Sequence, residues 1–249
     1  MKSAFLASLA PLAPLALLAL TLPLAAAAAE PATASAFHWS SGAVFGTSRM
    51  FRGQQQTDGQ AAVSAEVKLA HDNGTYAGIW AGSLDLGPGT DTKAEIDYFV
   101  GWGKRYGKWS VNTGYLYRQR PSSTLSLDFQ EVLASAVYDF GVARTGVGVY
   151  YSWDYFQGGN STYTYANLRV PFGLIKGAQV TGSVAAGHYD FSNRAVGNYN
   201  DIDLRLIARS GSWQYSVGYS KTDVKASQSG LLTRDRAGGR ARAEVLVMF

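Results

Sequence analysis

The chain contains no cysteine among its 249 residues. This absence excludes a lipoprotein anchor, a disulfide framework and any chemistry that uses a thiolate. Only three residues are histidine and only 16% are charged, so the side chains that most often act in catalysis are scarce. The formal net charge of +4 is too small to indicate a nucleic-acid partner, and we expect none.

The first residues have the pattern of a secretory signal peptide. Lys2 supplies a positive start, residues 4–24 form an apolar stretch with three prolines, and Ala27, Ala28 and Ala29 are the small residues that a signal peptidase needs. We therefore expect residues 1–29 to be removed and residues 30–249 to form one domain. A second cleavage option ends at Ala36, and an uncleaved anchor is the alternative. Cleavage leaves 21 basic and 18 acidic residues, a net charge of +3.

Long apolar runs are absent after the signal: none approaches the roughly 20 residues that a transmembrane helix needs. The rest of the chain is nevertheless rich in aromatic residues and glycine. A membrane protein without such helices has to close its strands on one another, because unpaired backbone groups are not tolerated in hydrocarbon.

Short segments of alternating polarity follow from Phe37 onward. In one of them, an apolar face of Ala94, Ile96, Tyr98, Val100 and Trp102 opposes a polar face of Lys93, Glu95, Asp97 and Gly101. This period of two is typical of strands. The pattern predicts about twelve strands of membrane-spanning length. They cover residues 37–49, 61–71, 75–85, 93–103, 109–118, 128–138, 142–153, 162–170, 178–188, 199–209, 213–222 and 238–249.

The connections between these segments alternate in length. Short turns such as residues 71–74 and 139–141 alternate with longer polar stretches such as residues 50–60 and 223–237. Outer-membrane barrels have short periplasmic turns and longer extracellular loops. The sequence therefore predicts an all-β protein, a transmembrane antiparallel β-barrel in the bacterial outer membrane, with outer-membrane lipid around it.

Aromatic residues cluster at the ends of the predicted strands. Trp39, Trp109 and Trp213 adjoin the short turns, while Tyr151 and Trp153 lie at the opposite ends, as two interfacial girdles would require. Trp80 departs from this pattern, and we expect it near the middle of the membrane. The chain ends on Phe249 after an alternating strand. A terminal aromatic residue of this kind resembles the signal read by the outer-membrane insertion machinery.

Residues 51–85 resemble a known family. The run Phe51-Arg52-Gly53-Gln54-Gln55-Gln56-Thr57 is similar to a loop of the TorF-type porins, and residues 70–85 are similar to the stretch that follows it in that family. Departures occur at Ser83, where the family usually has Asn, and at residues 73–75. The resemblance implies a porin-like barrel over nearly the whole mature chain. It supplies no catalytic or binding residues to carry over.

If the apolar faces meet lipid, the polar faces line a lumen. Twelve tilted strands enclose a backbone diameter of about 24 Å, which side chains narrow to about 10 Å or less. The candidate lining residues are Glu66, Lys68, Lys93, Glu95, Asp97, Arg118, Arg144, Arg169, Asp203, Arg205, Arg209, Arg240, Arg242 and Glu244. The acids gather on the early strands and the bases on the late ones, which predicts a laterally polarised lumen with a weak anion preference. The alternative is that these charges pair across the barrel and plug it.

The leading hypothesis for function is a channel for passive diffusion of small hydrophilic solutes or ions. The alternative is a non-conducting structural or adhesion barrel that acts through its outer loops. We expect no enzyme, no cofactor and no metal site. His188 near Asp190 is the most suggestive catalytic pair, but spacing alone does not make a nucleophile–base arrangement. The solute and the oligomeric state are not indicated by the sequence.

Overall fold

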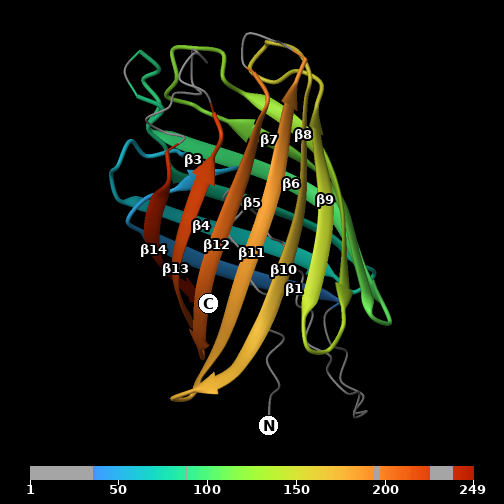
Figure 1. Cartoon of the computed structure of the whole chain (residues 1–249). Helices are drawn as coiled ribbons and strands as arrows, with labels where there is room; N and C mark the ends of the chain where they lie inside the picture. Colours follow the sequence, from blue (N-terminus) through green and yellow to red (C-terminus); the bar gives the residue numbers. More distant parts are fainter. Residues whose placement is uncertain (1–35, 88, 193–196, 225–237) are drawn as a thin grey trace.

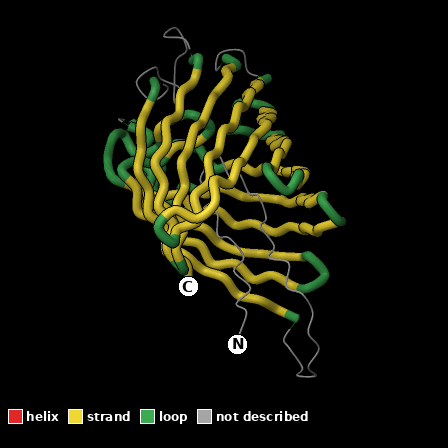
Figure 2. The backbone as a smooth tube through the Cα atoms, turned by 60° about the horizontal axis from the view of Figure 1, so that its bottom comes forward, coloured by secondary structure: helices red, strands yellow, loops and turns green. Residues whose placement is uncertain are grey.

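The computed structural model describes residues 36–87, 89–192, 197–224 and 238–249. The predicted signal peptide therefore lies outside the described residues. Almost every described segment is a strand or a connection between strands, as Figure 2 shows in yellow and green. None of the described residues belongs to a helix long and apolar enough to cross a membrane.

Twelve antiparallel strands form a closed barrel (Figure 1). They are β1 (Phe37–Gly46), β4 (Ala62–His71), β5 (Thr75–Ser83), β6 (Ala94–Tyr106), β7 (Trp109–Gln119), β8 (Phe129–Asp139), β9 (Arg144–Ser152), β10 (Ser161–Ile175), β11 (Ala178–Phe191), β12 (Tyr199–Ser210), β13 (Trp213–Thr222) and β14 (Arg240–Met248). The prediction of twelve strands is thus confirmed. Two short strands, β2 (Met50–Phe51) and β3 (Gln54–Gln55), form a separate hairpin.

The barrel closes between its first and last strands. β1 pairs with β4 on one side and with β14 on the other, with Gly42 opposite Met248 and Phe45 opposite Val245. The Phe249 amide adds one more bond, to the Ser41 carbonyl at 3.0 Å. Every one of the twelve described barrel strands therefore has a partner on both sides, which is the condition for a β-structure in hydrocarbon.

Alternate residues point to opposite sides of the barrel wall, as the period of two requires. On β6, Tyr98 and Val100 are 41% and 52% exposed on the outside, whereas Asp97 is fully buried inside. Val63, Val67, Ile79, Val132, Val147, Leu204, Leu206 and Val217 are likewise exposed on the outside. An apolar exterior around a charged interior inverts the arrangement of a soluble protein and fits a lipid environment.

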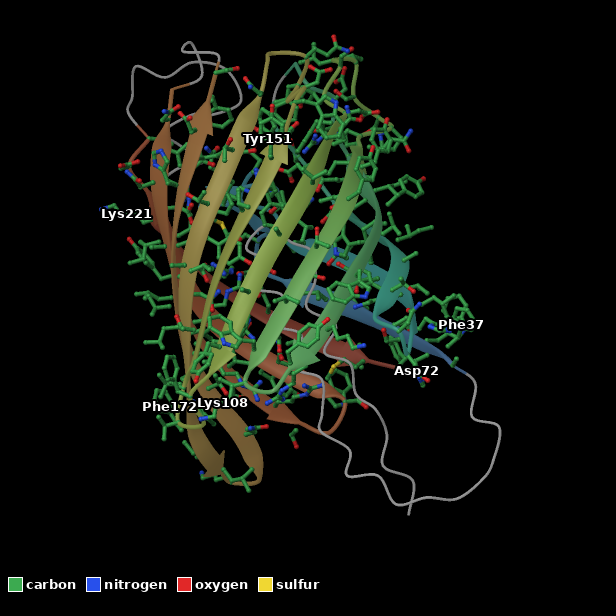
Figure 3. All side chains as sticks on the ribbon, turned by 90° about the vertical axis from the view of Figure 1, so that its right-hand side faces the viewer. Phe37, Asp72, Lys108, Tyr151, Phe172 and Lys221 are labelled. Atoms are coloured by element: carbon green, nitrogen blue, oxygen red, sulfur yellow. The ribbon has the colours of Figure 1, made fainter. Side chains whose placement is uncertain are left out.

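The two ends of the barrel differ in their connections. The short turns follow β4, β6, β8, β10 and β12. Both described chain ends lie at that end, since the Asp72 amide of one turn donates to Ala36 and the Met248 amide donates to Ser212 of another. Figure 3 places Lys108 and Phe172 at this short-turn end and Tyr151 toward the opposite, long-connection end. Three tryptophans project outward near the short turns, with exposed fractions of 71%, 51% and 48%: Trp39, Trp109 and Trp213. Their positions agree with the predicted girdle at that end.

One hairpin is longer than the sequence pattern indicates. β10 continues to Ile175, beyond the predicted end at residue 170, and β11 pairs with it through a register shift between Pro171 and Gly173. Pro171 is tolerated here because β9 pairs with β10 only as far as Arg169, so the amide that proline lacks would face an unpaired edge. Gly173 takes a positive φ of 87° at the irregularity, a conformation that glycine adopts without strain.

Candidate functional site

The connection between β1 and β4, residues 47–61, folds into the barrel, and we call it the lumen loop. All ten residues from 48 to 57 are buried, and the β2–β3 hairpin forms the inner part of the loop. The sequence predicts a long extracellular loop over residues 50–60. Its length is correct, but the loop turns inward because its polar groups find partners on the inner wall.

The tip of the lumen loop reaches across the lumen. Arg52 and Gly53 have positive φ angles of 46° and 76°, which turn the hairpin. A Cβ on Gly53 would lie 2.6 Å from Asp201 Cβ and closer still to Thr222 Cγ2, so the loop backbone packs directly on β12 and β13. β12 lies six strands from β6 in either direction around the ring. The loop therefore spans from one wall to the opposite one.

A buried network of charges holds the loop against β6, β7 and β8. Arg49 of the loop pairs with Glu95, and Arg52 pairs with Glu131 at 2.8 Å. From the wall, Arg118 lies 3.2 Å from Glu95, 3.3 Å from Asp97 and 3.5 Å from Glu131. Arg120 adds a contact to Glu95 at 2.5 Å. Four guanidinium groups thus surround three carboxylates, and removal of a carboxylate would leave buried positive charge without compensation.

Aromatic rings surround the Arg52 guanidinium. Its Cζ lies 4.4 Å from the centroid of Tyr163, 4.7 Å from that of Tyr189 and 4.8 Å from that of Tyr150. Burial opposes the charge of Arg52, but the charge and hydrogen bond of Glu131, together with the nearby hydroxyls of Tyr189 and Tyr163, outweigh burial, so the pKa of Arg52 is raised well above its ordinary value. The charge is therefore permanent, and cation–π contacts add to the ion pair.

Trp80 belongs to the same assembly. It is fully buried inside the barrel, and the Arg49 guanidinium lies 4.4 Å from its ring centroid. The sequence predicts Trp80 near the middle of the membrane, and the structure adds that its ring faces the lumen and not the lipid. Its inward position follows from β5, where Tyr76, Gly78 and Trp80 share the inner face.

A second, smaller charge cluster lies on β12 and β14. Asp203 accepts from Arg205 at 2.8 Å and from Arg242 at 2.6 Å. Glu244 lies 3.3 Å from Arg242 and 3.6 Å from Arg205. Two arginines and two carboxylates are thereby matched within one region of the wall.

A cavity of about 410 Å³ lies at the short-turn end, beyond both charge clusters. Its lining comes from β8 to β13 and the β8–β9 turn: Asp139, Gly141, Ala143, Arg144, Arg169, Pro171, Gln179, Thr181, Ile207, Arg209 and Gln214. The lumen is therefore filled by the loop and its partners in one half and hollow in the other.

The structure places most of the predicted lining residues on the inner wall. Glu66, Glu95, Asp97, Arg118, Asp203 and Arg242 are buried there, and Lys68, Arg144, Arg169, Arg205, Arg209 and Glu244 are partly buried. Lys93 is exposed in the connection before β6, and Arg240 is exposed at the start of β14. The early acids do not form a bare acidic wall, because arginines from the lumen loop and β7 neutralise Glu95 and Asp97.

Sequence reasoning missed four members of the network: Arg49, Arg52, Arg120 and Glu131. The three arginines fall in or beside connections, where solvent is the default surrounding. A mixture of aromatic and charged residues at Phe51–Arg52 was the available signal. Glu131 lies on the polar face of β8, opposite Val132 in the alternation, and could have been assigned from that pattern alone.

The histidines are dispersed. His188 lies 2.9 Å from the Asn200 side chain, and His38 lies 2.6 Å from Asp72 at the short-turn end. Asp190 instead accepts from Asn198. The His188–Asp190 pairing considered from the sequence is therefore absent from the hydrogen bonds among the described residues.

Comparisons with known proteins agree with this architecture. A comparison with curated proteins gave no match. Among solved structures, a KdgM porin aligns with a TM-score of 0.55 at 8% identity, covering 84% of this chain and 99% of that chain. A NanC porin aligns with a TM-score of 0.51 at 11% identity, covering 85% and 99%. At these identities the likeness concerns the fold alone, which is the closed barrel of porins.

A family model described as "Bacterial protein of unknown function (Gcw_chp)" matches residues 28–247. This match covers the barrel strands from β1 through all but the last residue of β14. It does not carry the TorF name that the loop motif suggests. The chain belongs to the Gcw_chp family.

Proposed function

We propose that this protein is an outer-membrane channel for passive diffusion of small hydrophilic solutes or ions. The observation that carries the proposal is a closed barrel with an apolar exterior and a charged interior that holds a cavity of about 410 Å³. A wall of this kind separates lipid from a polar path. No step of catalysis is needed for such a role, and we propose none.

The lumen loop sets the size limit of the proposed channel. Because ten of its residues are buried between opposite walls, the outer half of the lumen is far narrower than the empty barrel would be. Ions and small solutes are the expected cargo. A solved KdgM porin with a similar fold is described in complex with disordered oligogalacturonate, which supports a hydrophilic cargo here.

The route to the membrane forms part of the proposal. Residues 1–29 would direct export, and the β14 strand ending in Phe249 would be read by the insertion machinery. Phe249 is 76% exposed at the seam between β1 and β14, where another protein can reach it. Membership of the TorF group remains a prediction that rests on the loop motif.

Planar-bilayer recording of the purified protein tests the channel. We expect unitary conductance steps, and liposomes that contain the protein should swell in small sugars or amino acids. If there are no steps and no solute causes swelling, the non-conducting structural or adhesion barrel becomes the better account. Heat-modifiable gel migration would show in both cases that the barrel is folded.

A further inference from the structure

The cavity at the short-turn end has an excess of positive charge. Its lining contains three guanidinium groups, from Arg144, Arg169 and Arg209, and one carboxylate, from Asp139. The three arginines come from β9, β10 and β12, so three separate strands direct cations into one space. The lining therefore has a net charge of +2, three positive charges less one negative.

The carboxylate in the lining is already occupied. Asp139 lies 3.0 Å from Arg144 Nε and 3.8 Å from Arg105, which is outside the lining. Arg209 donates to the thioether sulfur of Met248 at 2.9 Å, a neutral acceptor. Arg169 is the third cation of the lining. The cations of the cavity thus exceed what its own acid can balance.

The other half of the lumen is different. There, four arginines each contact a carboxylate of the wall: Arg49, Arg52, Arg118 and Arg120. Each arginine of the loop network thus contacts a carboxylate, whereas the lining of the cavity has one carboxylate for three arginines. A partly desolvated cluster of cations attracts anions more strongly than the same charges would in water.

We propose that this cavity binds the carboxylate or phosphate group of a small anionic solute. Guanidinium groups bind both oxyanions through paired hydrogen bonds. Gln179, Thr181 and Gln214 in the same lining supply neutral hydrogen-bonding groups for the remainder of the solute. The volume lies within the range of small-ligand pockets. The inference names the solute class for the proposed channel and rests on that function for its biological meaning, but binding is measurable without conduction.

Equilibrium dialysis of the full mature chain in detergent micelles tests the binding. The probes are succinate, inorganic phosphate and neutral glucose. The variants are Arg169→Gln, Arg209→Gln and the two combined, and Lys108→Gln is the control because it removes one positive charge from the same end outside the lining. We expect each single variant to weaken anion binding about tenfold, the usual effect of losing one hydrogen bond to a charged group. The control should not change.

Binding of succinate, of phosphate or of both, lost in the double variant, supports the proposal. It is overturned if neither anion binds more tightly than glucose, or if the double variant binds like the wild type while its heat-modifiable migration shows a folded barrel. A bilayer arm separates this proposal from the channel itself. Anion binding without conductance would refute the channel only, while conductance with an equal preference for cations and no anion binding would refute the site only.

Discussion

Two adjacent residues at the tip of the lumen loop carry much of its geometry. Arg52 holds a left-handed backbone that costs a non-glycine residue of order 1 kcal/mol, which its ion pair and ring contacts offset. Gly53 next to it has no room for a side chain, since Thr222 and Asp201 occupy the space. The position of the loop in the lumen thus depends on the ion pair of Arg52 and on the lack of a side chain at Gly53.

Gly53→Ala should displace the loop from β12 and β13. The added Cβ would clash with two side chains at a positive φ, so the hairpin has to move inward or leave the wall. We expect a changed unitary conductance and faster protease cleavage within residues 47–61. Gly59→Ala is the matched control, because its φ is also positive, at 79°, but an added Cβ there would meet nothing within 4 Å among the described residues. Equal behaviour of the two variants would contradict the packing role of Gly53.

Glu131→Gln should destabilise the folded barrel. The change leaves the Arg52 charge buried among rings with its main partner gone, which costs about 3 kcal/mol or more. The measurement is the free energy of unfolding in urea for protein refolded into lipid. The double variant Arg52→Met with Glu131→Gln should recover part of the loss. A single variant as stable as the wild type would show that the pair is not needed.

At the scale of elements, the lumen loop is separable from the barrel that contains it. β1 and β4 pair over ten positions from Phe37–His71 to Gly46–Ala62, so their register does not depend on the loop between them. Apart from the Thr47 amide, which donates to the Ala243 carbonyl of β14 where the loop begins, the loop contacts the wall through residues of β6, β8 and β13 and does not continue the ladder of the described barrel strands. It therefore works as an insert that narrows a barrel already complete.

Deletion of residues 50–56 should widen the channel without unfolding it. Removal of the hairpin opens the outer half of the lumen, and we expect single-channel conductance to rise several-fold in planar bilayers. Arg49, Arg118 and Arg120 lie outside the deletion, so three cations remain for the three carboxylates Glu95, Asp97 and Glu131. Heat-modifiable migration should persist. A deleted protein with unchanged conductance would mean that the loop does not limit the path.

At the scale of the whole molecule, the closed ring gives the barrel two different ends. The described chain ends and the short turns share one end, and the positive cavity lies there too. The long connections and the lumen loop share the other. The arrangement fits a chain inserted from the periplasm, with the narrow part on the cell surface and the wide, basic part facing inward.

Single cysteines can test this orientation, because the chain has none of its own. Asp154→Cys lies in the exposed connection after β9, and Lys108→Cys lies in the short turn after β6. A membrane-impermeant maleimide applied to intact cells should label the thiol at position 154 and label position 108 only after the cells are broken. The reverse pattern would invert the topology.

The sequence by itself determined the strands and their two faces. Glu66, Glu95, Asp97 and Arg118 could be assigned to the interior because successive side chains of a strand point to opposite sides. The same rule predicted the number of strands and which connections are short. The end of one strand differs from the sequence pattern: β10 passes through Pro171, since pairing with β11 continues after β9 has stopped.

Only the tertiary structure decided what fills the lumen. Whether residues 47–61 lie outside or inside depends on partners distant in sequence, such as Glu131 and Thr222, which barrel closure brings within reach. The pairing of charges is decided in the same way, because Arg49 reaches Glu95 of β6 only when the loop folds into the barrel. The alternation along a strand fixes whether each side chain points into the barrel or out of it. Which residues fill the lumen depends on contacts between segments that only the closed barrel brings together.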